Sequence, residues 1–518
     1  MMGALRAGRH LARLLSIAVI LARYDAAFPL ARVQGAGWLV FVFRLFRRRD
    51  AALRALRPGQ RLALALNRMG PSFIKLGQAL STRVDLIGEE MAADLSHLQD
   101  RLPPFPSEAA RRMIERELGQ PIAVLYAHFD DEPVAAASIA QVHFARTTEG
   151  EEVAVKVLRP GIAQAMARDI ELFQWLAQLG ERWQPSLRRL KPVAVVGMLA
   201  ETVRIELDLR MEASAAAELR DNFADDDKFR VPRIDWARTG RHVLTLERVG
   251  GIRVDDRAAL LAAGFDPREL LARAAASFFY QVFRDGFFHA DMHPGNLFID
   301  DSGALVVVDF GIMGRLDRAT RFYLADMLVG FLNGDYRRVA EVHFEAGYVP
   351  SEQSLDAFAQ AARAIGEPIF GRPLQEISLG RLLAQLFQVT EQFAMETQPQ
   401  LLLLQKTIVL VEGMGRQLDP TVNVWVLARP LVEEWMRANR GPEARIREAV
   451  EEAKIHLERL PATLRRLEEL VRVIDEEGGV PLHPAALEAL AKRGALEILG
   501  LPLWLIAAAL IAIAIALW

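Results

Sequence analysis

Three polar side chains in the second half of the chain have the spacing of a phosphoryl-transfer site. The run His-Ala-Asp-Met-His-Pro-Gly-Asn occupies residues 289–296, and a later apolar run ends in Asp-Phe-Gly at 309–311. Asp291 has the position of a group that accepts or orients the proton of an attacking molecule, while Asn296 and Asp309 would each supply an oxygen to Mg²⁺. The sequence therefore predicts phosphoryl transfer that depends on Mg²⁺.

A β-hairpin should bring these side chains together. Apolar runs at 297–299 and 304–308 flank an Asp-Asp-Ser-Gly turn at 300–303, which is typical of two strands joined by a tight turn. The alternative is a surface loop with scattered acidic residues. The order and separation of the two motifs disfavour that alternative.

A candidate phosphate-binding lysine lies in a predicted strand earlier in the chain. Strands are predicted at 129–134, 139–146 and 153–158, separated by turns. Lys156 ends the run Val-Ala-Val-Lys in the third strand, where a kinase-like lobe keeps its phosphate-binding lysine. The run alone is common, but its strand context and the acidic motifs favour this role.

The turn between the first two predicted strands consists of Ala135, Ala136, Ala137 and Ser138. A loop that covers nucleotide phosphates is normally rich in glycine, because its backbone must approach phosphate and adopt positive φ. Three Cβ methyl groups restrict that approach. We therefore expect this alanine loop to bind ATP differently from a glycine loop.

In a kinase-like fold, a glutamate on a helix holds this lysine, and the backbone of a hinge between the two lobes contacts adenine. A helix predicted at 192–219 carries candidate acids, and spacing alone does not choose among Glu206, Asp208 and Glu212. A strand from residue 243 then ends in two glycines at 250–251. Its backbone would contact adenine at Glu247 and Val249.

The segment after residue 311 lacks the Ala-Pro-Glu motif that ends the peptide-binding platform of protein kinases. This argues against ordinary Ser/Thr/Tyr kinase activity.

The apolar run at 401–414 is interrupted by Lys406 and Glu412, so it is predicted to be a buried helix. Near the N-terminus, Lys75 and Gln78 share a helix face at i and i+3, a pattern that alone favours a solvated surface.

Both chain ends are candidates for membrane contact. Residues 1–70 contain thirteen arginines and no lysine, which predicts basic amphipathic helices on an anionic membrane surface. An ordinary solvated helical face is the alternative.

Residues 498–518 are uncharged and almost wholly apolar, and as a helix they would be about 31 Å long, enough for one transmembrane span. A buried terminal helix is the alternative. Lys492 and Arg493 would keep the catalytic part cytoplasmic.

Composition narrows the possible partners and cofactors. The chain of 518 residues has a formal net charge of −3 and no cysteine. We therefore expect no nucleic-acid partner, no disulfide and no thiolate metal site. No flavin or iron motif is present.

Taken together, the chain resembles the UbiB family of atypical kinase-like proteins over nearly its whole length. The resemblance rests on the two catalytic motifs, the alanine loop, Lys-Leu-Gly-Gln at 75–78, Ser-Thr-Arg-Val-Asp-Leu at 81–86, Glu-Leu-Asp at 206–208 and Gln-Pro-Gln-Leu at 398–401. It implies an α+β, bilobal protein-kinase-like fold with an N-terminal helical extension, to which the apolar run adds a C-terminal transmembrane helix. Bacterial relatives often carry two spans, whereas this chain has length for one.

The resemblance also implies residue roles and a domain order. Lys156 and Glu212 would form the ion pair between the lobes, and a covering helix would act through Lys75, Gln78, Glu206 and Asp208. The predicted segments are a helical extension at 1–106, an N-lobe with inserted helices at 107–250, a C-lobe at 251–440, an amphipathic connector at 441–497 and the span at 498–518.

The implied function is that of a membrane-bound kinase or ATPase that uses ATP and Mg²⁺ and supports ubiquinone biosynthesis. Its partners would be membrane lipid, polyprenyl-quinone precursors and enzymes of that pathway, at the bacterial inner membrane. One alternative is a lipid-binding scaffold that uses nucleotide only as a conformational ligand. Another is an antibiotic-type small-molecule kinase, which does not explain the anchor or the N-terminal helices.

Overall fold

The computed structural model describes residues 2–26, 53, 55–81, 87–96, 98, 102–183, 192–368, 389–390, 392–395, 398–419, 421 and 424–440. The predicted connector at 441–497 and the predicted transmembrane helix at 498–518 lie outside these residues. Among the residues described, no helix is both long and apolar enough to cross a membrane.

The first sheet carries the predicted lysine. Its strands pair in the order β1-β3-β4-β6, and the short β2 adds to β3. The bounds are β1 Tyr126–Phe129, β2 Ala135–Ala136, β3 Ala140–Thr147, β4 Glu152–Leu158 and β6 Val243–Glu247. Val153, Val155 and Val157 of β4 are buried in one cluster with α8 (Ser107–Leu118). Because side chains alternate along a strand, Lys156 lies on the opposite face.

The strand predicted at 129–134 is wrong, whereas the next two are confirmed to within a residue or two at each end. β1 ends at Phe129, and the first two alanines of the loop form β2, paired with Gln141 and Val142. Residues 130–133 are Asp-Asp-Glu-Pro. Acidic residues are unfavourable in strands, and Pro133 has no N–H to donate to a ladder. The strand therefore breaks there.

The helix predicted at 192–219 is two helices, α11 (Pro192–Glu206) and α12 (Leu209–Asn222), which follow α10 (Ile162–Trp183). Asp208 lies between them, and its side chain accepts the backbone N–H of Arg210 at 3.2 Å as the N-cap of α12. The break places Glu206 and Glu212 on different helices.

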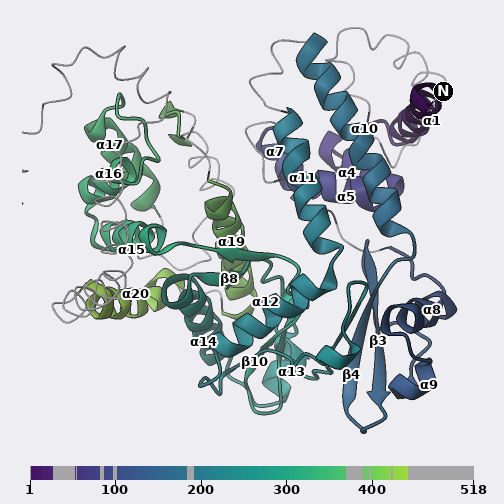
Figure 1. Ribbon diagram of the computed structural model, residues 1–518. Coiled ribbons are helices and arrows are strands. Elements are labelled where there is room, and N and C mark those ends of the chain that lie inside the picture. Colours follow the sequence, from purple (N-terminus) through teal and green to yellow (C-terminus); the bar gives the residue numbers. More distant parts are fainter. Residues whose placement is uncertain are drawn as a thin grey trace, which may run out of the picture. The chain divides into compact units, whose positions relative to one another are not determined.

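The N-terminal helices pack around α5 (Figure 1). They are α1 Met2–Arg23, α4 Pro58–Met69, α5 Pro71–Ser81 and α7 Glu89–Ser96. A Cβ at Gly77 would lie 2.4 Å from a methyl carbon of Leu98 and 2.7 Å from one of Leu66, so glycine allows this close packing. Arg13 of α1 binds both carboxylate oxygens of Asp169 on α10 at 2.9 Å.

A second sheet, in the order β5-β10-β9-β7, holds the predicted hairpin. β9 and β10 pair antiparallel, which confirms that hairpin, and β8 pairs with β11. The strands are β5 Phe229–Arg230, β7 Ile252–Arg253, β8 Phe287–His289, β9 Leu297–Ile299, β10 Leu305–Val307 and β11 Met313–Arg315.

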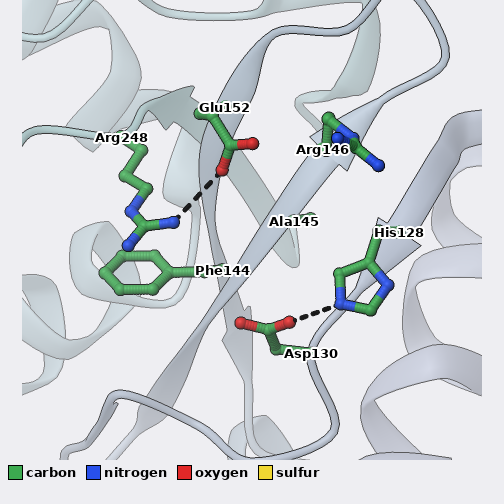
Figure 2. Close-up of a pocket in the computed structure, with 7 residues that line it drawn as sticks. All are labelled: His128, Asp130, Phe144, Ala145, Arg146, Glu152 and Arg248. Atoms are coloured by element: carbon green, nitrogen blue, oxygen red, sulfur yellow. Dashed lines mark hydrogen bonds and ion pairs between the residues drawn. The ribbon is translucent and has the colours of Figure 1, made fainter.

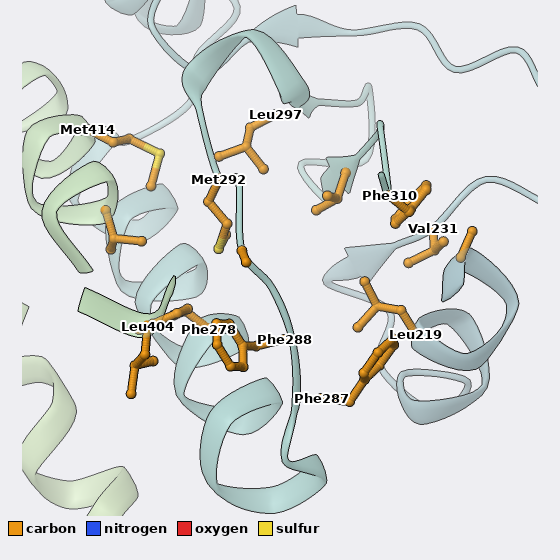
Figure 3. Packing of buried hydrophobic residues seen from close by; sticks show 14 of the residues in the cluster. Leu219, Val231, Phe278, Phe287, Phe288, Met292, Leu297, Phe310, Leu404 and Met414 are labelled. Atoms are coloured by element: carbon orange, nitrogen blue, oxygen red, sulfur yellow. The ribbon is translucent and has the colours of Figure 1, made fainter. Parts of the chain in front are cut away.

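Most helices that follow pack with these strands in one large apolar core, part of which Figure 3 shows. The helices at 336–345 and 355–366 form smaller clusters, and the short helix at 122–125 belongs to the cluster of the first sheet. The helix predicted at 401–414 is confirmed as α19. The helices are α9 Ile122–Leu125, α13 Arg257–Ala262, α14 Pro267–Phe279, the π-helical segment η4 Tyr280–Asp285, α15 Arg318–Asn333, α16 Tyr336–Glu345, α17 Leu355–Gly366, α19 Pro399–Leu418 and α20 Val424–Arg440, with 3₁₀ turns η3 Trp236–Arg238 and η5 Pro294–Asn296.

Candidate active site

The β9–β10 hairpin places both candidate metal ligands beside the candidate base. Asn296 lies immediately before β9, and Asp309 lies two residues after β10. The Asn296 amide donates to the backbone oxygen of Asp291 at 3.1 Å and lies 3.4 Å from its carboxylate Oδ2. These contacts use the amide nitrogen, which leaves the amide oxygen of Asn296 as the atom for a metal ion.

His289 fixes the backbone around Asp291, a role that the motif alone did not predict. Its side chain is fully buried, and burial lowers the pKa of the imidazole. Nδ1 accepts the N–H of Asp291 at 3.1 Å, so Nε2 carries the proton and faces the backbone oxygen of Val308 at 3.3 Å. A neutral histidine thus connects Asp291 to the strand that leads to Asp309. The His-x-Asp spacing is the signal that could have indicated it.

Lys156 contacts carboxylates from two other elements. Its Nζ lies 2.7 and 3.0 Å from the carboxylate oxygens of Glu212 on α12, and 2.8 Å from Oδ1 of Asp309. Burial opposes the charge on Lys156, but Asp309 and Glu212 together raise its pKa. The charge of Lys156 in turn lowers the pKa of Asp309 to about 2, so Asp309 is ionised at neutral pH, as a metal ligand must be. Of the three acids that spacing left open, Glu212 is the one placed against Lys156.

Helix α5 brings a second lysine to this region. Lys75 Nζ lies 3.0 Å from Oε2 of Glu206, and both side chains are buried. Lys75 also contributes to the lowered pKa of Asp309, which places its charge near the candidate metal ligands. Gln78 follows one turn later on α5 and is half-buried. The covering role of this helix stays a prediction.

Asp208 has contacts of its own at the start of α12. Its carboxylate oxygens accept from the Arg210 side chain at 2.8 and 2.6 Å, in addition to the backbone N–H of Arg210. These contacts explain Asp208 as a helix cap. The role that the resemblance implies for Asp208 beside the covering helix stays a prediction.

The alanine loop lies at the edge of the first sheet. Ala135 and Ala136 form β2, and the Arg159 guanidinium donates to the backbone oxygen of Ala137 at 2.8 and 3.0 Å. Ser138 is fully buried. None of the four residues has positive φ, so this backbone does not require glycine. Their contact with ATP stays a prediction.

The predicted hinge follows β6. Glu247 ends that strand, and its carboxylate pairs with Arg230. Val249 lies in the connection that follows. Gly251 has a φ of 140°, and a Cβ there would lie 2.4 Å from the backbone oxygen of Ile299. The hinge therefore passes so close to β9 that only glycine fits. Adenine contacts by the backbone of Glu247 and Val249 stay a prediction.

A surface pocket of about 280 Å³ lies against the first sheet (Figure 2). Its residue Phe144 pairs with Ala154, two residues before Lys156, so Phe144 lies on the same face as Lys156. The Arg248 guanidinium lies 4.0 Å from the ring centroid of Phe144 and 3.1 Å from Oε2 of Glu152. Because Arg248 precedes Val249, the pocket extends from the sheet to the hinge. Its lining residues are His128, Asp130, Phe144, Ala145, Arg146, Glu152 and Arg248.

Comparison with known proteins agrees with this arrangement. The model of the ABC1 atypical kinase-like domain matches residues 97–343, and that of the UbiB helical domain matches residues 362–423. A Marinobacter nauticus protein named "Probable protein kinase UbiB" is 43% identical over 493 residues, which cover 93% of this chain and 89% of that protein. The chain belongs to the UbiB family. Its kinase-like α+β fold follows from that membership.

Other proteins of the same name are similar to this chain. One from Aeromonas salmonicida is 46% identical over 427 residues, covering 81% of this chain and 78% of that protein. One from Xanthomonas campestris pv. campestris is 42% identical over 456 residues, covering 85% and 82%. A solved Mycobacterium tuberculosis protein in complex with erythromycin has a TM-score of 0.49 and 24% identity, covering 71% of this chain and 93% of that one.

The part matched by the UbiB helical domain contributes a residue that the sequence did not single out for the site. Lys406 of α19 lies 2.9 Å from Oδ1 of Asp291. In the sequence, Lys406 only interrupts an apolar run, and it stands 115 residues from its partner. No local pattern connects the two.

The side chains at this site fit ATP and Mg²⁺. No group of three or more His, Cys, Asp or Glu that could hold a metal ion occurs among the residues that the structure describes. Mg²⁺ in nucleotide sites commonly takes one or two protein oxygens together with phosphates and water. The ionised Asp309 and the amide oxygen of Asn296 match that requirement, and Lys156 matches the need for a cation at the phosphates.

Proposed function

We propose that this protein is an atypical kinase or ATPase that acts on Mg-ATP. The observation that carries the proposal is the contact of Lys156 with both Glu212 and Asp309. The hairpin joins Asp309 to Asn296, and the Asn296 amide donates to the backbone of Asp291. Structural ion pairs are common in proteins. Here, however, a lysine, a base and two oxygen ligands occur together in the order that phosphoryl transfer requires.

Each side chain then has one task. Lys156, held by Glu212, binds the α- and β-phosphates, while Asn296 and Asp309 hold Mg²⁺. Asp291 accepts or orients the proton of the attacking water or hydroxyl group. When bound, Mg²⁺ neutralises the charge that develops on the phosphates.

We extend the proposal to ubiquinone biosynthesis at the cytoplasmic face of a bacterial inner membrane. Membership of the UbiB family supports it, as do the arginine-rich N-terminus and the apolar run at 498–518. Polyprenyl-quinone precursors or ring-modifying enzymes are the proposed partners. The missing Ala-Pro-Glu motif argues against a protein acceptor.

A nucleotide-regulated lipid-binding scaffold is the second candidate. Two observations favour it: the alanine loop replaces a glycine loop, and the Ala-Pro-Glu motif of the peptide platform is missing. The presence of Lys156, Asp291 and Asp309 opposes it.

Complementation separates the two candidates. A bacterium that lacks its own gene of this family would receive the wild type, Asp309→Asn, or the control Asp301→Asn in the exposed turn of the same hairpin. We expect the wild type and the control to restore ubiquinone and Asp309→Asn to fail. Restoration by Asp309→Asn would show that catalysis is dispensable and would favour the scaffold.

A further inference from the structure

Helix α19 packs against α14 and against β11, the strand that pairs with β8 at the start of the catalytic segment. Leu404 and Met414 of α19 belong to the same buried core as Phe278 of α14 and Met292, the residue after Asp291 (Figure 3). Met292 is fully buried. The packing of α19 and the path of the backbone at Asp291 therefore depend on each other.

The C-terminal end of α19 is fastened to the same lobe. Arg257 of α13 donates to the backbone oxygen of Leu418 at 3.0 Å, and Arg268 of α14 pairs with Asp419 at 2.5 Å. With its apolar face in the core and its end tied to two helices, α19 has a fixed position. The position of Lys406 on α19 is fixed with it.

Lys406 and Asn296 hold different atoms of the Asp291 carboxylate. Lys406 Nζ lies 2.9 Å from Oδ1, and the Asn296 amide lies 3.4 Å from Oδ2. The Lys406 side chain is 40% exposed and that of Asp291 is 31% exposed, so the pair can be reached from outside. Two partners on two oxygens restrict the rotation of the carboxylate.

The catalytic segment itself supplies no such cation. Residues 289–296 contain neither lysine nor arginine. The ring nitrogens of the neutral His289 contact backbone atoms of Asp291 and Val308. The positive charge next to Asp291 therefore comes from the helical domain, far along the chain.

We infer that Lys406 is the positioning residue for Asp291, and that the kinase-like domain needs the helical domain to complete its site. This inference rests on the proposed function. As the attacking oxygen forms its bond to the γ-phosphorus, its proton passes to Asp291. The bond from phosphorus to the bridging oxygen breaks, and its electron pair stays on ADP. Lys406 holds the accepting carboxylate in place for that step.

The test compares full-length wild type with Lys406→Met, Lys406→Arg, Asp291→Asn and the double variant Asp291→Asn/Lys406→Met. Lys228→Met, at an exposed loop position, controls for the loss of one positive charge. Hydrolysis of Mg-ATP gives kcat and KM, and titration with ATP gives Kd. A merely structural role for Lys406 would change stability and Kd rather than kcat alone.

We expect Lys406→Met to lower kcat by about tenfold or more, with KM and Kd within about threefold of wild type. Lys406→Arg should recover part of the loss, because it keeps a charge within reach of Oδ1. In the Asp291→Asn background, removing Lys406 should change kcat by less than about twofold, since Lys406 acts through Asp291.

The inference is overturned if Lys406→Met hydrolyses ATP as fast as the wild type, or if it loses the same factor with and without Asp291. A loss of ATP binding in Lys406→Met with kcat preserved would also overturn it. If the wild type itself hydrolyses no ATP, the proposed function fails and the inference fails with it. Equal activity of wild type and Lys406→Met overturns the inference alone.

Discussion

Asp309 has a φ of 65°, in the left-handed region that non-glycine residues seldom adopt. Aspartate and asparagine tolerate this region better than most residues, because their short side chains can bond locally. The conformation directs the carboxylate of Asp309 to Lys156, at 2.8 Å. The choice of substitution at this residue therefore separates chemistry from backbone strain.

We predict that Asp309→Asn and Asp309→Ala both lose Mg²⁺-dependent turnover, and that only Asp309→Ala also loses stability through backbone strain. Alanine in the left-handed region costs about 1–2 kcal/mol, so its melting temperature should fall below that of Asp309→Asn. Thermal unfolding of the two purified variants measures this. Equal melting temperatures would contradict the role given to the backbone here.

His343 gives the molecule a pH-dependent stability away from the site. Its ring centroid lies 4.9 Å from that of Phe358, and Nδ1 contacts the backbone oxygen of Val339 at 2.8 Å. Burial lowers the pKa of His343. Below about pH 6.5, His343 binds a proton in the unfolded chain but stays neutral in the native state. The free energy of unfolding therefore falls as the pH falls.

We predict that His343→Phe reduces the loss of melting temperature between about pH 7.5 and pH 5.5, because phenylalanine fills the space without titrating. Thermal unfolding at both pH values measures the slope. An unchanged slope in His343→Phe would show that this residue does not contribute.

The hinge illustrates how an element depends on a single backbone position. At Gly251, a Cβ would lie 2.4 Å from the backbone oxygen of Ile299, whereas at Gly250 nothing lies within 4 Å. Gly251→Ala should therefore cost about 2 kcal/mol or more and weaken ATP binding, while Gly250→Ala should stay within about 0.5 kcal/mol of the wild type. Unfolding by urea and titration with ATP compare the pair. Similar behaviour of both variants would contradict the close approach of hinge and β9.

The alanine loop is the second element with a direct test. Ala135 and Ala136 pair with β3, and glycine there would loosen β2 by about 0.5–1 kcal/mol. We predict that Ala135→Gly or Ala136→Gly changes the ratio of ATP to ADP affinity. The control is Ala127→Gly, at an exposed position of β1. Unchanged binding of both nucleotides in both loop variants would remove this role.

Elements were predictable where the sequence pattern is local. The hairpin before Asp309 followed from two apolar runs and a turn. The strand predicted at 129–134 failed because the acidic residues at 130–132 and Pro133 are unfavourable in a strand, and the single helix at 192–219 failed because Asp208 acts as a cap. In both cases, residues that end a strand or cap a helix interrupted the element that the sequence pattern predicted.

At the scale of the whole molecule, Lys75, Lys156 and Lys406 come from distant segments and form ion pairs around one site. Lys156 joins β4 to α12, Lys75 joins α5 to α11, and Lys406 joins α19 to Asp291. The catalytic motifs identify the chemistry from sequence because their spacing is short. The contact of Lys406 could not be predicted, since it depends on how α19 packs across the lobe. The pair of Lys75 was implied only by family resemblance.

Asp291, Asn296, Asp309 and Lys156 form the proposed phosphoryl-transfer site. Its most direct test is ATP hydrolysis by the purified full-length protein, with and without Mg²⁺, for wild type, Asp291→Asn and the surface control Asp301→Asn. We predict Mg²⁺-dependent turnover in the wild type and the control, and a loss of about a hundredfold or more in Asp291→Asn. If Asp291→Asn hydrolyses ATP as fast as the wild type, these residues are not a phosphoryl-transfer site.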